Sequence, residues 1–261
     1  MTHEDAILGS GVPAHVDLLI GSLPLRLSSR DSSLLSAASR RYQGFQHNES
    51  NRFSIEIDRH LAKHEGSDAF ICDFEGARVS ANSRNAHFSG VHHEYALDSL
   101  LRMFLSWALL PQDGFLLHAA SIVRNGKAYV FVGRSGAGKS TVASLSPQRS
   151  VLTDEISLIK RVDGEWHAFG TPFWGEFRAD GVNTSAPLGG IFRLIQSSEN
   201  CVEPIRSSAL LKSLLPCVLF FSADTGDHKR LLGILAAASA EIPGYSLRFR
   251  KDRSFWEVLP S

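Results

Sequence analysis

The chain has 261 residues, which is enough for one large domain or for a core with an accessory domain, and its apolar interior needs no cross-links. Lysine and arginine together number 27, as do aspartate and glutamate, so no overall charge attracts a nucleic acid or an anionic membrane. Three cysteines lie far apart without a CxxC pair, which argues against a disulfide framework and a zinc cluster.

The first 110 residues favour a β-rich accessory region of α+β type. Alternating apolar and polar residues predict strands near 53–57 and 70–74. The serine-rich stretch from Ser28 to Ser39 is compatible with a linker, but the leucines and alanines within it favour a short helix.

Apolar residues at helical spacing predict an amphipathic helix over 97–108, which Pro111 closes. We place a domain boundary there. The chain then divides into an accessory region, residues 1–110, and a nucleotide-binding core, residues 111–261.

The core alternates strands and helices. A continuous apolar run at 128–132 predicts a strand buried on both faces. Asp163-Gly164 predicts the turn of an antiparallel hairpin over 156–169. Two further strands are predicted at IFRLI and YSLRFR, with helices near 204–214 and 227–240. This mixture predicts an α/β fold with a mixed sheet.

Residues 133–140 match G-x-x-x-x-G-K-[ST] between a predicted strand and a predicted helix, the context in which this motif binds nucleotide phosphates. Three glycines let consecutive backbone amides point at one anion, and the helix adds its positive end. Lys139 supplies charge for the β- and γ-phosphates, and Ser140 supplies a hydroxyl for Mg²⁺. The alternative is a glycine-rich turn with an exposed lysine. The residues expected to bind nucleotide are Gly133, Arg134, Ser135, Gly136, Ala137, Gly138, Lys139, Ser140 and Thr141.

Two further elements lie near this loop in the sequence. VLTDE (151–155) is typical of a strand that ends in acids facing a nucleotide-bound metal, and Asp154 follows Lys139 by only fifteen residues. His118, in LLHAAS, has the side chain best suited to proton transfer near neutral pH. The ordinary alternatives are two solvated acids at a turn and a hydrogen-bonded core histidine.

LLHAAS, GRSGAGKST and VLTDE, at these spacings, resemble the HPr kinase/phosphorylase family and its relatives, which share a core with phosphoenolpyruvate carboxykinase. The resemblance covers roughly residues 113–200. It implies that the loop binds ATP, that Asp154 acts as base toward a serine hydroxyl and that His118 supports it. It also places Glu155 at the family's second aspartate and Glu176 at a metal-binding glutamate.

The resemblance implies a kinase that uses ATP and Mg²⁺, with Lys139, Asp154 and His118 as catalytic residues and Ser140, Glu155 and Glu176 at the metal. The expected acceptor is then a hydroxyl, that of a serine in a peptide or protein or that of a small molecule, and the resemblance also implies a homo-oligomer. Two alternatives are a nucleotide hydrolase and a non-catalytic nucleotide sensor or partner module, which needs ligand binding alone.

Other candidates carry weaker signals. His60 and His64 share a face if they are helical, but a metal needs a third ligand and two solvated histidines are the ordinary interpretation. GTPFWGE (170–176) resembles a segment of the HPr-kinase-like relatives. The alternative is that Phe173 and Trp174 only pack in the apolar interior. Three arginines are candidates to stabilise a transferred phosphoryl group: Arg178, Arg193 and Arg248.

We expect a cytoplasmic protein without a membrane partner. The first ten residues carry two acids and no basic stretch that leads into an apolar segment, unlike a secretory signal. The longest apolar runs are too short for a bilayer or are interrupted by Arg102, Lys212 and Pro216.

Overall fold

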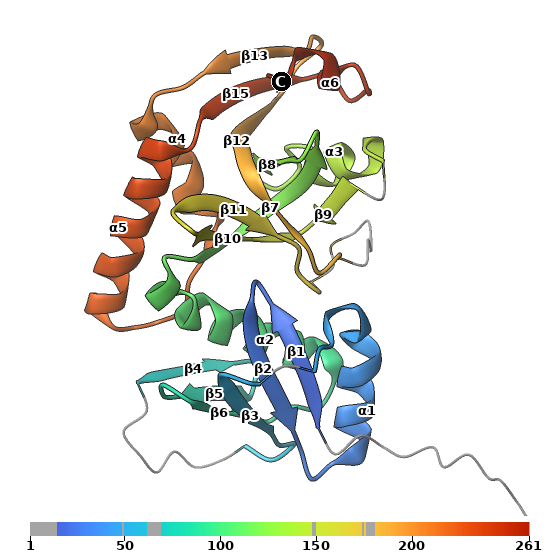
Figure 1. Cartoon of the computed structure of the whole chain (residues 1–261), viewed down its shortest axis with the longest axis vertical. Coiled ribbons are helices and arrows are strands. Elements are labelled where there is room, and N and C mark those ends of the chain that lie inside the picture. Colours follow the sequence, from blue (N-terminus) through green and yellow to red (C-terminus); the bar gives the residue numbers. More distant parts are fainter. Residues whose placement is uncertain are drawn as a thin grey trace, which may run out of the picture.

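The computed structural model describes residues 15–48, 50–61, 69–147, 150–173, 175 and 181–260. These residues form two β-sheets with helices packed on them, a mixed α/β architecture. Figure 1 shows the first sheet in the lower half of the molecule and the second in the upper half.

The first sheet is built from the N-terminal part of the chain. Its order is β1-β2-β3-β6-β5-β4, with parallel pairing of β2 with β3 and of β3 with β6. One face is apolar and buried while the other is polar, as the alternating burial of β3 shows. The predicted strands at 53–57 and 70–74 are β3 and β4. The six strands are β1 (Val16–Ile20), β2 (Leu23–Ser28), β3 (Phe53–Ile57), β4 (Phe70–Phe74), β5 (Ala77–Ala81) and β6 (Asn85–Ser89).

Two helices accompany this sheet. Helix α1 (Ser32–Arg41) begins where the Asp31 carboxylate accepts hydrogen bonds from two backbone amides, an N-cap that a serine-rich linker would not need. Helix α2 (Glu94–Ala108) begins at His93, whose Nδ1 atom accepts from the Ala96 amide at 3.1 Å. The predicted helix at 97–108 is therefore confirmed and begins one turn earlier.

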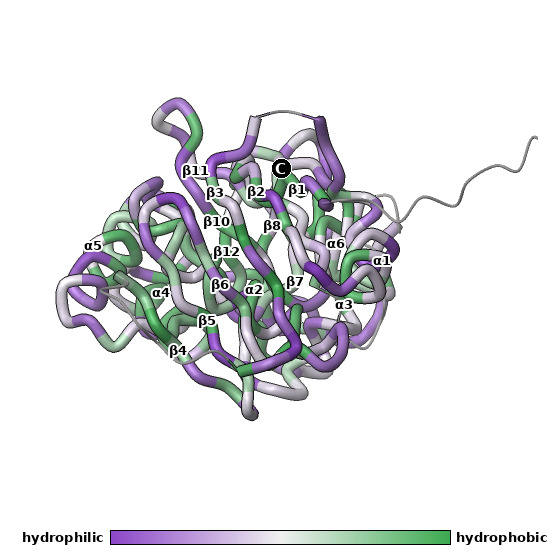
Figure 2. The backbone as a smooth tube through the Cα atoms, turned by 90° about the horizontal axis from the view of Figure 1, so that it is seen from below, coloured by the Kyte–Doolittle hydropathy of each residue, from purple (hydrophilic) through white to green (hydrophobic). Residues whose placement is uncertain are grey.

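Helix α2 lies where the two sheets meet (Figure 1), and its apolar side chains pack toward both of them. One continuous core contains α2 residues such as Phe104, residues of the first sheet, and Leu116 and Leu158 of the second. Figure 2 shows hydrophobic segments around α2 in the middle of the molecule and many hydrophilic segments at its edge. The two sheets therefore share buried apolar surface.

The second sheet contains the strands that carry the predicted site. Its order is β11-β10-β7-β8-β12-β15-β13, with β9 and β14 also paired with β7. Because β11 also pairs with β12, the strands β10, β7, β8, β12 and β11 close into a small barrel. The nine strands are β7 (Phe115–Arg124), β8 (Lys127–Val132), β9 (Val151–Thr153), β10 (Ile156–Val162), β11 (Glu165–Phe169), β12 (Ser185–Gln196), β13 (Cys201–Pro204), β14 (Val218–Leu219) and β15 (Gly244–Phe249).

Local predictions in this half are confirmed where turn chemistry or periodicity is strong. The β10–β11 hairpin turns at Asp163 and Gly164, whose φ angles of 49° and 87° suit Asp-Gly. The predicted strand at IFRLI is the end of the much longer β12. The helices of this half are α3 (Lys139–Leu145), α4 (Ser207–Leu214), α5 (Thr225–Glu241) and α6 (Phe255–Val258). None of the helices in the described residues combines enough length and apolar character to span a bilayer.

Candidate functional site

The glycine loop, defined here as Gly133–Gly138, joins the buried strand β8 to helix α3. Gly136 and Gly138 have φ angles of 77° and 114°, which side chains rarely adopt. A Cβ atom on Gly138 would lie 3.1 Å from the Phe249 ring, and one on Gly133 would lie 2.8 Å from the Cβ of Ala137. The tight curl of this loop therefore needs glycine at these positions.

Lys139 begins α3 and folds back over the loop. Its side chain is buried, and Nζ donates to the carbonyl oxygen of Gly133 at 3.0 Å. Gln196, at the end of β12, donates from Nε2 to the carbonyl of Gly136 at 2.5 Å and ties the exposed tip of the loop to the sheet. No motif marks Gln196 in the sequence, because its role depends on β12 lying beside β8.

The strand register brings His118 and Glu155 next to the start of this loop. His118 of β7 is paired with Ile156, and its neighbour Ala119 is paired with Val132, the residue before Gly133. His118 Nε2 lies 3.7 Å from Oε2 of Glu155. Three segments that are separate in sequence thus adjoin across β8, β7 and the β9–β10 connection.

The imidazole of His118 is held toward its neutral form. Burial lowers its pKa below the ordinary value of 6.5, and the Lys139 and Arg102 charges lower it further, while the Glu155 carboxylate acts in the opposite direction. A neutral imidazole can accept a proton at neutral pH.

Asp154 lies in the short bend between β9 and β10 and is buried, with 2% of its surface exposed. Thr153 Oγ1 shapes this bend by accepting from the amides of Glu155 and Ile156. The Gly175 amide donates to Asp154 Oδ1 at 3.1 Å, and a Cβ there would lie within 2.9 Å of both carboxylates. Only glycine lets the backbone approach the acid pair so closely.

The remaining predicted residues differ in how the structure places them. Arg134 and Ser135 are exposed on the loop, while Ser140 and Thr141 are half-buried in the first turn of α3. Phe173 is buried beneath the Arg102 guanidinium, 4.9 Å from the ring centroid, so packing explains it. Glu176, Trp174 and Arg178 lie outside the described residues.

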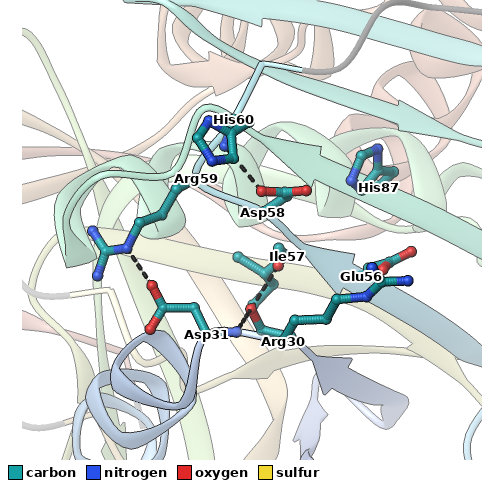
Figure 3. A pocket seen from close by; sticks show the side chains of 9 residues that line it. Arg30, Asp31, Glu56, Ile57, Asp58, Arg59, His60 and His87 are labelled. Carbon is teal, nitrogen blue, oxygen red and sulfur yellow. Dashed lines mark hydrogen bonds and ion pairs between the residues drawn. The ribbon is translucent and has the colours of Figure 1, made fainter.

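His60 does not lie in a helix, so the structure does not support two histidines on one helix face. His60 lies in a bend, where its amide donates to Asp58 Oδ1 at 2.9 Å, and His64 is outside the described residues. His60 lines a cavity of about 670 Å³ together with His87 and the ion-paired Arg59 and Asp31 (Figure 3). Nowhere in the described ranges do three His, Cys, Asp or Glu side chains gather to hold a metal.

The acids next to the glycine loop suit a different kind of metal binding. Mg²⁺ in nucleotide sites is commonly held by one or two carboxylates and a hydroxyl, with phosphate oxygens and waters completing the octahedron. Asp154, Glu155 and Ser140 are oxygen donors of this kind. They fit Mg²⁺ that arrives with a nucleotide better than a metal caged by protein alone.

The fold and this arrangement define an α/β protein in which a strand, a glycine loop and a helix adjoin a histidine and two acids. The sequence pattern of the family described as SynChlorMet cassette protein ScmC matches residues 98–260, and the chain belongs to that family. None of the curated proteins matches the chain.

Among solved structures, the chain is similar to the Hpr(Ser) kinase/phosphatase from Coxiella burnetii. The match has 12% sequence identity and a TM-score of 0.28, and it covers 47% of this chain and 87% of the other. A TM-score this low does not establish a shared fold.

Proposed function

We propose that the protein transfers the γ-phosphoryl group of ATP to a hydroxyl group, with serine of a peptide or protein as the preferred acceptor. The observation that carries the proposal is the placement of His118, 3.7 Å from Glu155, at strand positions that adjoin the glycine loop. A phosphate cradle beside a base and a carboxylate is the arrangement that phosphoryl transfer requires.

Each residue has a separate task in this proposal. Backbone amides of the loop and the Lys139 ammonium bind the β- and γ-phosphates. The acceptor oxygen forms a bond to the γ-phosphorus while the bond to the β–γ bridging oxygen breaks, and ADP leaves. Asp154 accepts the hydroxyl proton, and neutral His118 holds the acceptor side of the site in position.

Mg²⁺, bound with the nucleotide, would neutralise charge that develops on the phosphate oxygens. Ser140 and Glu155 are the described residues that would hold it, and Glu176 belongs to the same proposal although it lies outside the described residues. Oε2 of Glu155 lies 3.7 Å from His118 Nε2, so the proposed metal ligand and the proposed positioning residue are neighbours.

Two other functions would use the same residues and differ from a kinase in what receives the phosphoryl group, if anything does. A hydrolase would pass the phosphoryl group to water, and a nucleotide sensor would bind without turnover. The test is mass spectrometry of a serine-containing peptide pool and of cellular proteins after incubation with the purified protein, Mg²⁺ and γ-labelled ATP. A kinase yields acceptors heavier by one phosphoryl group.

The controls use two matched substitutions, Asp154→Asn at the site and Asp163→Asn at the exposed hairpin turn. Label transfer that Asp154→Asn abolishes and Asp163→Asn preserves supports the kinase. Steady phosphate release without any acceptor would identify a hydrolase. Nucleotide binding with neither product would identify a sensor.

A further inference from the structure

A cavity of about 380 Å³ opens beside the glycine loop, on the opposite side from the acids. The sheet order explains the separation, because β7, with the histidine and the acid pair, flanks β8 on one side and β12 flanks it on the other. Gly133, Arg134 and Ala137 contribute the loop side of the cavity. Residues of β12, of α4 and of the 3-10 turn Leu215–Cys217 contribute the rest. Its volume falls within the range of roughly 300–1,000 Å³ that is usual for small-molecule pockets.

The polar side chains of this cavity are mainly donors. Arg134, Arg193 and Lys212 line it, and no carboxylate or side-chain amide is among its described lining residues. Arg193 Nε is buried without a hydrogen-bond partner in the described structure, and Nη2 reaches Ser246 Oγ only at 3.5 Å. A buried donor without a partner is unfavourable, so a ligand that offers an acceptor would satisfy it.

The other walls are apolar. Ala137, Leu194 and Pro216 line the cavity, and Leu194 belongs to the buried core beneath the loop. Apolar walls with a few donors suit a flat aromatic ring, whose faces pack on carbon while its ring nitrogens accept hydrogen bonds. Guanidinium groups also stack on such rings.

We propose that this cavity holds the purine base and ribose of the nucleotide whose phosphates lie on the glycine loop. The inference rests on the proposed function and adds the location of the nucleoside. The loop then separates two half-sites, with the nucleoside toward β12 and α4 and the acceptor hydroxyl toward the acids.

Purine rings present nitrogen acceptors that the Arg193 guanidinium and the Lys212 ammonium can satisfy. The nucleoside should therefore add to the affinity that the phosphates supply. We expect ADP to bind at least about tenfold more tightly than pyrophosphate.

The test compares ADP and pyrophosphate, each with Mg²⁺, by isothermal titration calorimetry, because neither is a γ-phosphoryl donor that the proposed kinase would turn over. Ser213→Phe fills the cavity from the half-buried face of α4, and Ser208→Phe makes the same change at an exposed position of that helix. Arg193→Gln removes the guanidinium donors without filling the cavity. Lys139→Ala disables the loop itself.

We expect Ser213→Phe and Arg193→Gln to weaken ADP about tenfold or more and to leave pyrophosphate unchanged. Ser208→Phe should change neither, and Lys139→Ala should weaken both. Wild-type protein that binds ADP and pyrophosphate while the two cavity variants retain full ADP affinity would overturn the nucleoside site alone, and so would equal affinity of the wild type for ADP and pyrophosphate. Wild-type protein that binds neither ligand would overturn the proposed function as well.

Discussion

The Lys160 ammonium lies 2.7 Å from the carbonyl oxygen of Gly21 and so ties β10 of the second sheet to the β1–β2 turn of the first. Both residues are buried, and Gln112 Oε1 accepts a second hydrogen bond from the same ammonium at 3.2 Å. A polar bond thus crosses the apolar interface between the sheets.

Lys160→Met should destabilise the protein at neutral pH by about 1–3 kcal/mol, because the buried Gly21 carbonyl loses its donor. Urea unfolding measures the change, and Lys229→Met on exposed α5 is the matched control. A variant as stable as the control would show that the bond contributes nothing at the interface.

The same lysine predicts a pH dependence. Burial lowers the pKa of Lys160 from 10.5, and the Arg52 charge adds to the effect. Between the lowered pKa and 10.5 the unfolded chain binds more protons at this position, so its contribution to stability rises with pH. We expect the stability difference between wild type and Lys160→Met to grow over this window. A difference that shrinks would have the wrong sign.

A second buried charge joins α1 to α2. Asp98 accepts from Tyr42 Oη at 2.7 Å and forms an ion pair with Arg41, and both charged side chains are less than a tenth exposed. Asp98→Asn should cost about 3 kcal/mol, because removing one partner of a buried pair leaves the other charge poorly compensated. Thermal unfolding checks this, with exposed Asp113→Asn as the control.

The lowered pKa of His118 predicts where the activity falls in acid. If neutral His118 is the working form, the acid limb of the pH–rate profile should have its midpoint below 6.5, because burial lowers the pKa of His118 from that value. A pH–rate profile measures the midpoint, with His118→Gln removing this limb and His87→Gln leaving it. A midpoint above 6.5 would contradict the assignment.

Asp154→Asn should lower turnover by at least about a hundredfold while ATP affinity changes little. The amide keeps the size of the buried side chain and can still accept from Gly175, but it cannot take a proton. Single-turnover kinetics and equilibrium binding separate the two effects. Equal losses in binding and turnover would assign Asp154 to the nucleotide instead.

Gly138→Ala should weaken nucleotide binding by about tenfold or more, because a Cβ would meet the Phe249 ring at 3.1 Å and the φ angle of 114° disfavours a side chain. Gly233→Ala, on an exposed face of α5 with nothing within 4 Å, is the matched control and should preserve binding. Unchanged affinity in Gly138→Ala would show that the loop conformation is not needed for the ligand.

The sequence by itself predicted the elements whose cause is local. Strand β8 follows from an apolar run, and the glycine loop and the start of α3 follow from the G-x-x-x-x-G-K-[ST] motif. The turn at Asp163 follows from residues that tolerate positive φ. The β1–β2 hairpin was not predicted, although its burial alternates, because its turn at Gly21-Ser22 carries a weaker signal.

Only the tertiary structure decided which strands adjoin. β7 lies between β8 and β9, so His118 meets Glu155, while β12 on the other flank brings Gln196 to the loop and Arg193 to the cavity. Strand partners depend on burial of apolar faces between residues far apart in sequence, and no local pattern records that choice. The sequence singled out the residues of the candidate site in separate segments. Their contacts exist only because the sheet places those segments side by side.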